Sequence, residues 1–186
     1  MENWDASVAA RLKREAERWT KEDLLQIWEK TKGGQTIDGW SAGKAFEYLV
    51  IRAFDIEKTR VCWPFLVTYP QRFGTMEQID GIVYLGERAF LVESKDLSTP
   101  AAIEAVAKLR FRLEGRPPST MGIIFSVDNF SLPTEVFTQF ASPLNVLLWG
   151  SSDLDSALKQ SAMTKALALK LEYAIEFGLP LFPLGD

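Results

Sequence analysis

Two apolar runs near the middle of the chain, separated by a pair of turn residues, constrain the fold most strongly. Residues 78–85 (QIDGIVYL) and 88–95 (RAFLVESK) flank the dipeptide Gly86-Glu87. A two-residue connection with glycine first is typical of a tight β-hairpin, because glycine tolerates the positive φ that such turns require. Apolar residues occupy both faces of these runs, so we expect two strands in the interior of a sheet.

Helical and strand-like segments alternate along the rest of the chain from about residue 41. The predicted helices cover residues 43–54, 99–113 and 133–140, and the predicted strands cover residues 61–69, 78–85, 88–95, 121–127 and 145–149. Two further helices follow. Alternation of this kind predicts an α/β fold with a mixed β-sheet flanked by helices.

The chain begins with two amphipathic segments that we expect to be helices. Thr20 and Asp23 have the spacing of a capping box, and Gly33 and Gly34 end the second helix. A length of 186 residues is within the range of one domain. We therefore expect an N-terminal helical extension over residues 1–40, a core over 41–150, and C-terminal helices over 151–186 that pack on the core.

Composition removes several kinds of catalytic site. The chain has no histidine, which excludes Ser-His-Asp and Cys-His systems and histidine-ligated zinc. Its one cysteine, Cys62, has no second thiol with which to pair. Any catalysis must therefore rest on carboxylates, lysines or hydroxyls. The net charge of −4 argues against tight unassisted DNA binding, but it allows a local basic patch or an acidic cluster balanced by divalent ions.

The chain lacks the features of a secreted or membrane protein. Its N-terminal sequence has no secretory pattern, and no apolar run approaches the roughly 20 residues that span a bilayer. We expect a cytoplasmic protein without a membrane partner.

The hairpin brings ionisable residues together by register. If Gly86 and Glu87 form the turn, Asp80 comes directly opposite Glu93, and directly opposed residues share a face with Cβ atoms about 4.5–5.5 Å apart. Lys95 lies two residues beyond Glu93, so it points to the same face. Two carboxylates and one ammonium group are thus predicted to converge at the open end of the hairpin.

Two carboxylates this close repel each other unless one is protonated or a cation lies between them. Mg²⁺ prefers a few carboxylate oxygens and retains several waters, so we expect it to bind Asp80, Glu93 and a backbone carbonyl at Ser94. Lys95 would then orient a nucleophilic water or stabilise charge on a phosphoryl group. The alternative is a strand-end Asp80 beside a surface charge pair of Glu93 and Lys95, although the apolar neighbours favour a functional site.

The order of these motifs resembles that of the PD-(D/E)-x-K nuclease superfamily, with its restriction-endonuclease-like fold. Within it, the segments GKAFEYLVIRAF, QIDGIVYL, AFLVESKD and MGIIFSVDNFS are similar to those of Mrr-type restriction endonucleases. The similarity covers about residues 41–149, and Ile79 stands where the family nominally has proline.

The resemblance implies phosphodiester hydrolysis with Mg²⁺, for which Mn²⁺ can substitute. It implies that Asp80 and Glu93 bind the metal, that Lys95 assists the attacking water, and that a glutamate on the first core helix, here Glu47, adds a metal contact. A solvated carboxylate on that helix is the alternative for Glu47.

Several polar residues near this hairpin are candidates for contact with nucleic acid. Gln78 shares the face of Asp80, so it can contact substrate or make an ordinary hydrogen bond. Lys108, Arg110 and Arg112 concentrate positive charge at the end of the following helix, where they can hold phosphates. The alternative is a solvated basic helix terminus, which the helix dipole favours.

The sequence therefore predicts a metal-dependent endonuclease that acts on DNA in bacterial restriction, defence or DNA processing, with RNA not excluded as a substrate. Dimerisation, or membership of a larger complex, would explain how a small single-site nuclease cuts both strands. The alternative function is a non-catalytic subunit that keeps the nuclease fold for nucleic-acid binding or scaffolding.

Overall fold

A computed structural model describes residues 6–40, 43–69, 74–95 and 103–184 of the chain. The helices are α1 (Ala6–Ala16), α2 (Lys21–Lys32), α3 (Lys44–Ile56), α4 (Ile103–Glu114), α5 (Leu132–Phe140), α6 (Ser151–Gln160) and α7 (Met163–Phe177). The strands are β1 (Val61–Cys62), β2 (Phe65–Tyr69), β3 (Gly74–Ile79), β4 (Gly81–Leu85), β5 (Arg88–Lys95), β6 (Met121–Ser126) and β7 (Val146–Trp149).

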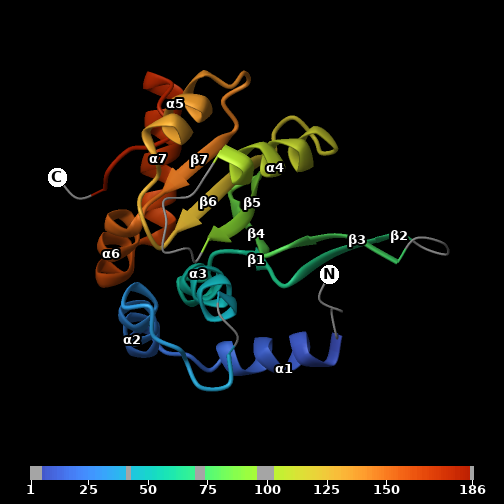
Figure 1. Cartoon of the computed structure of the whole chain (residues 1–186), viewed down its shortest axis with the longest axis vertical. Helices are drawn as coiled ribbons and strands as arrows, with labels where there is room; N and C mark the ends of the chain where they lie inside the picture. The colour runs from blue at the N-terminus through green and yellow to red at the C-terminus, as the bar shows by residue number, and fades with distance from the viewer. Residues whose placement is uncertain (1–5, 41–42, 70–73, 96–102, 185–186) are drawn as a thin grey trace.

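The main sheet has five strands in the order β1-β4-β5-β6-β7 (Figure 1). β1 and β5 pair antiparallel with β4, whereas β5, β6 and β7 run parallel. The two parallel connections pass through α4 and α5. The predicted mixed α/β sheet flanked by helices, with its N-terminal helical extension, is confirmed.

Alternate residues of the central strands divide the core into two layers. Phe90 and Val92 point to the side of α3, α6 and α7, and Leu91 points to the side of α4. The parallel neighbour continues the pattern with Phe125 on the first side and Ile124 on the second. Because both faces of β5 and β6 are covered, these strands are buried as the apolar runs predict.

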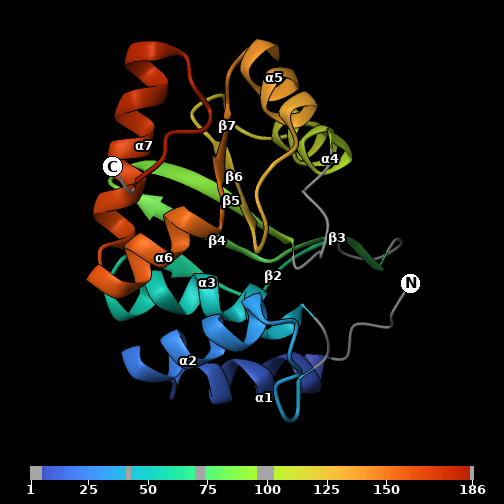
Figure 2. The same cartoon turned by 60° about the vertical axis from the view of Figure 1, so that its left-hand side comes forward.

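The N-terminal helices extend the first layer. Figure 2 shows α1 and α2 stacked beneath α3, on the side away from the sheet. The predicted capping box opens α2, with the Thr20 hydroxyl accepting from the Asp23 backbone and the Asp23 carboxylate accepting from the Thr20 backbone. Trp28 is fully buried and stacks on Phe46 of α3 at 5.8 Å between ring centroids.

The prediction of one strand over residues 61–69 is wrong. β1 pairs with β4 for two residues, after which the chain leaves the sheet and β2 pairs with β3 in a separate ribbon that projects from the body of the molecule (Figure 1). Pro64 lies at the break and has no N–H to donate to a ladder, which explains why the strand does not continue. The start of the helix predicted over residues 99–113 lies outside the described residues.

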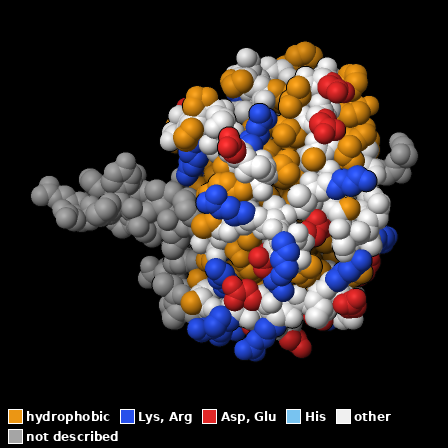
Figure 3. Space-filling view, turned by 180° about the vertical axis from the view of Figure 1, so that it is seen from behind, with side chains coloured by type: hydrophobic (Ala, Val, Ile, Leu, Met, Phe, Trp, Pro, Cys, Tyr) orange, Lys and Arg blue, Asp and Glu red, His pale blue; other side chains and the backbone are white. Residues whose placement is uncertain are grey.

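Apolar side chains are unevenly distributed over the surface. Figure 3 shows hydrophobic side chains gathered toward the end of the molecule that carries α5 and α7, and Lys and Arg side chains interspersed with acidic ones at the end of α1 and α2. The most exposed apolar residues on these helices are Leu132, Phe140, Ile175 and Phe177. None of the described helices combines the length and apolar character needed to cross a membrane.

Candidate active site

The hairpin of β4 and β5 has the predicted register. Leu85 pairs with Arg88 across the turn, and the ladder continues to Gly81 opposite Val92. Gly86 has a φ of 59°, as the tight turn requires. The predicted strand over residues 78–85 is divided at Asp80, which lies between β3 and β4, so Asp80 is not paired with Glu93 as predicted. It lies immediately beyond the last paired residue, at the open end of the hairpin.

Asp80 contacts the neighbouring strand directly. Its Oδ2 accepts a hydrogen bond of 2.6 Å from the backbone N–H of Ser94. Burial, with Glu47 and Glu93 nearby, raises the pKa of the Asp80 carboxyl well above its usual range, and the Ser94 hydrogen bond only partly opposes this. Three carboxylates from β5, α3 and the β3–β4 junction therefore lie within electrostatic reach of one another.

Glu93 is the most enclosed of the three carboxylates. Glu93 is only 5% exposed to solvent. Lys95 Nζ donates to Oε1 at 2.7 Å, Arg112 Nη1 donates to Oε2 at 2.5 Å, and Lys108 Nζ lies 3.7 Å from Oε1. Burial alone would raise the pKa of the Glu93 carboxyl, but the three cations outweigh it and hold that pKa below its usual value.

Glu47 lies in the first turn of α3 and faces the hairpin. Lys44, three residues earlier on the helix, donates to its Oε2 at 2.6 Å. Burial raises the pKa of the Glu47 carboxyl despite Lys44, and Glu93 adds to the increase. The structure thus brings together Glu47, Asp80, Glu93 and Lys95, the residues that the sequence singled out for catalysis.

The carboxylates of Glu47, Asp80 and Glu93 are ligands of the kind that a hard divalent cation prefers, but their present arrangement does not form a metal-binding cluster. Within the described part of the chain, no three Asp, Glu or Cys side chains lie close enough together to hold a metal ion as they stand. Each carboxylate is occupied instead by a lysine, an arginine or a backbone N–H. Carboxylate oxygens are nevertheless the ligands that Mg²⁺ prefers. A cation would offset both the burial and the repulsion from Glu47 and Glu93 that raise the pKa of Asp80.

Ser94 contributes to the site through its backbone. Its N–H holds Asp80, while its hydroxyl is buried and lacks a hydrogen-bond partner among the described residues. Ser126 on β6 is the strand partner of Lys95, and its hydroxyl is likewise buried and without a hydrogen-bond partner among the described residues. The strand end that carries the candidate site therefore retains buried hydrogen-bonding capacity.

The three basic residues of α4 have different environments. Arg112 is directed into the site, where it contacts Glu93 and donates to the backbone carbonyl of Gln78 at 2.7 Å. Arg110 is directed away from it and donates to the backbone oxygens of residues 141–143 and to Asn145. Lys108 has a side chain 58% exposed. Of the three, Lys108 has the position most open to a phosphate of a bound substrate.

Two contacts of this site go beyond the residues predicted from the sequence. The first is the ion pair of Lys44 with Glu47, for which the spacing of three residues on a predicted helix is a signal. The second is the contact of Arg112 with Glu93, which joins α4 to β5. It depends on tertiary packing, so no local sequence pattern predicts it.

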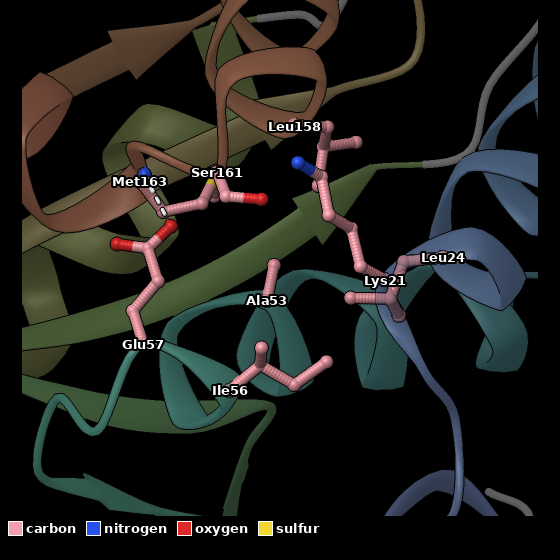
Figure 4. Close-up of a pocket in the computed structure, with 8 residues that line it drawn as sticks. All are labelled: Lys21, Leu24, Ala53, Ile56, Glu57, Leu158, Ser161 and Met163. Atoms are coloured by element: carbon pink, nitrogen blue, oxygen red, sulfur yellow. Dashed lines mark hydrogen bonds between the residues drawn. The ribbon is translucent and has the colours of Figure 1, made fainter.

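A pocket elsewhere on the surface also contains a carboxylate. It lies among α2, α3 and the start of α7, and Glu57 projects into it (Figure 4). The Glu57 oxygens accept from the backbone N–H groups of Met163 and Thr164 at 2.7 and 2.9 Å. Glu57 therefore acts as a cap for the N-terminus of α7, a structural role.

Comparisons with known proteins give a loose structural similarity and no sequence match. No family model matches the chain, and no curated protein matches it. Two solved structures are similar: the MspJI restriction endonuclease in complex with a 27-mer oligonucleotide, at a TM-score of 0.43, and the DNA modification-dependent restriction endonuclease AspBHI, at 0.47. Sequence identity is 16% in both cases.

The chain spans less than half of either of those proteins. The similarity covers 87% of this chain and 37% of the MspJI chain, and 88% of this chain and 42% of the AspBHI chain.

Proposed function

We propose that the protein is a metal-dependent nuclease that hydrolyses phosphodiester bonds in DNA. The observation that carries this proposal is the convergence of Glu47, Asp80 and Glu93, with Lys95 Nζ 2.7 Å from Glu93, at the open end of one hairpin. Burial, together with neighbouring carboxylates, raises the pKa of the Asp80 and Glu47 carboxyls, and shifts of this kind are characteristic of functional sites.

Asp80, Glu93 and Glu47 would hold Mg²⁺, or Mn²⁺ in its place, with the Ser94 carbonyl as a further oxygen ligand. When bound, such an ion supplies Lewis acidity toward the phosphate and lowers the pKa of a bound water. All of these proposed ligands are oxygen atoms, and Mg²⁺ prefers oxygen ligands.

Lys95 has the position to act on the nucleophile. Its ammonium group is tied to Glu93 and would orient a water toward phosphorus or stabilise charge on the phosphoryl oxygens. The water loses a proton to solvent as its oxygen forms a bond to phosphorus, the bond from phosphorus to the leaving oxygen breaks, and the leaving oxygen takes up a proton from solvent. Lys108 and Gln78 are proposed to position the nucleic-acid backbone, whereas Arg110 and Arg112, which the sequence also suggested for this role, bond to other parts of the protein.

The finer assignment depends on the sequence resemblance. The motifs in residues 41–149 support an Mrr-type endonuclease with a role in restriction, defence or DNA processing, and they support residues 41–150 as the nuclease core. A homodimer, or a subunit in a larger complex, is proposed as the functional unit because one site cuts one strand.

A second candidate function is a non-catalytic subunit with the same fold. It is favoured by the occupation of both Glu93 oxygens by Lys95 and Arg112, which leaves that carboxylate neutralised without a metal. A binding or scaffolding protein would keep this arrangement in all conditions.

Cleavage assays separate the two functions. Supercoiled plasmid, linear duplex and single-stranded DNA are incubated with Mg²⁺ or Mn²⁺ and with wild type, Asp80→Ala and Lys95→Ala. We expect metal-dependent cleavage by wild type and a loss of at least about 100-fold in both variants, since each removes a group used in the transition state.

Glu87→Gln is a matched control for these variants. Glu87 is an exposed carboxylate on the same hairpin, at its turn, and the change should leave cleavage unaffected. Cleavage that survives both Asp80→Ala and Lys95→Ala would contradict the proposed site, and no cleavage on any substrate would favour the non-catalytic subunit.

A further inference from the structure

Arg112 joins the two strand segments that carry the candidate metal ligands. Its Nη1 donates to Glu93 Oε2 at 2.5 Å, and its Nη2 donates to the Gln78 backbone carbonyl at 2.7 Å. Gln78 precedes Asp80 by two residues at the end of β3, while Glu93 lies on β5. One guanidinium therefore spans the two segments from which Asp80 and Glu93 project.

Arg112 is nearly as buried as its partner Glu93. Its side chain is 11% exposed and that of Glu93 is 7% exposed. A guanidinium presents several N–H groups in a fixed planar fork, so two bonds in different directions fix its orientation and that of the carboxylate. The bond to Oε2 also leaves Oε1 as the oxygen of Glu93 that faces Lys95.

We infer that Arg112 is a positioning residue that holds Glu93 through Oε2 and thereby sets the orientation in which the Glu93 carboxylate can bind a metal ion. The inference rests on the proposed function, because it concerns the same site. Groups that hold metal ligands in place from behind set the affinity of many metal sites, and their substitution costs about 10- to 100-fold in that affinity.

The competing explanation is electrostatic. A guanidinium next to a metal site also repels the cation, and on that ground alone its removal would tighten metal binding. Lysine separates the two effects, since Arg112→Lys keeps the charge but its compact ammonium group lacks the fork that reaches Glu93 and the Gln78 carbonyl together. Arg112→Gln removes both the charge and the fork.

The test is the binding of Mn²⁺ to the full chain, measured by titration calorimetry and by the loss of the free-ion electron paramagnetic resonance signal. We expect Arg112→Lys to weaken Mn²⁺ binding about 10- to 100-fold, and Arg112→Gln to weaken it as well. Thermal melting in EDTA reports whether each variant is folded before metal is added.

Arg52→Lys is the matched control. Arg52 also bonds one carboxylate, that of Asp55, and one backbone carbonyl, that of Trp19, and its side chain is 18% exposed. It lies outside the site, so this substitution should leave Mn²⁺ affinity at the wild-type value.

The outcomes distinguish the inference from the function on which it rests. Wild-type affinity in Arg112→Lys, or tighter binding in Arg112→Gln, would overturn the positioning role while metal binding itself stands. Absence of Mn²⁺ binding in wild type, or equal binding in wild type and Asp80→Asn, would overturn the proposed metal site and the inference with it.

Discussion

A single buried lysine ties the last part of the chain to the sheet. Lys170 on α7 is 1% exposed, and its Nζ donates to Asp153 Oδ2 at 2.8 Å and to the carbonyls of Leu148 and Phe182 at 3.1 and 2.6 Å. Burial lowers the pKa of the Lys170 ammonium, and the nearby Asp153 carboxylate opposes this. Because each partner neutralises the other, neither can be removed alone at low cost.

We expect Lys170→Met to destabilise the fold by about 3–5 kcal/mol, since it leaves the Asp153 carboxylate buried without a cation. Urea unfolding followed by circular dichroism measures the change. The double variant Lys170→Met with Asp153→Asn should recover part of the loss. Lys159→Met is the control, because the exposed Lys159 lies 4.0 Å from Asp155 and such pairs contribute about 0–1 kcal/mol. A loss below about 1 kcal/mol in Lys170→Met would contradict the interpretation.

Among the elements, the close approach of α3 to the hairpin brings Glu47 toward Asp80. Gly81, the first residue of β4, makes this possible because a Cβ atom there would lie 2.6 Å from Ile51 Cδ1 and 3.1 Å from the Cys62 carbonyl oxygen. Ile51 on α3 is fully buried, so it cannot turn away into solvent. The distance between helix and hairpin is therefore set at Gly81.

Gly81→Ala should destabilise the protein by about 1–3 kcal/mol, as is usual when a methyl group is forced into a packed interior. Gly115→Ala is the matched control, because the nearest atom to its added Cβ would be the Arg112 carbonyl oxygen at 3.9 Å. Urea unfolding compares the two. If both variants unfold at the same urea concentration as the wild type, the packing of α3 on the hairpin is looser than the structure shows.

What the sequence reveals about these elements depends on the range of the contacts. The β4–β5 hairpin follows from a two-residue turn and an apolar pattern, so its register could be predicted. The bond from the Ser94 N–H to Asp80 could not, because the ladder ends at Gly81 and leaves Asp80 in a bend. The β2–β3 ribbon could not, because the pattern of residues 61–69 does not show with which segment each half will pair. The contact between Arg112 and Glu93 likewise depends on how α4 packs on β5.

For the molecule as a whole, the candidate site is a source of instability in the absence of metal. The Asp80 carboxyl has a pKa raised by burial and by the neighbouring Glu47 and Glu93 carboxylates. In the unfolded chain the group titrates near its ordinary value of 3.8. Between that value and the raised one, the native state binds more protons than the unfolded state, so the free energy of unfolding falls as the pH rises through this window.

Asp80→Asn should therefore be more stable than wild type at neutral pH in EDTA, with a gain that shrinks as the pH falls toward 3.8. Differential scanning calorimetry over a pH series measures it, and each kcal/mol corresponds to a shift of about 2–4 °C in Tm for a protein of this size. Added Mn²⁺ should raise the Tm of wild type but not of Asp80→Asn, because a ligand stabilises only the state that binds it. A difference in Tm between the two proteins that does not change with pH would mean that the charge of Asp80 is not its cause. Equal stabilisation of both proteins by Mn²⁺ would mean that the metal binds elsewhere. The combination of a gain in EDTA and a loss of the metal response distinguishes an acidic site built for a cation from an ordinary strand-end aspartate, whose replacement would change neither.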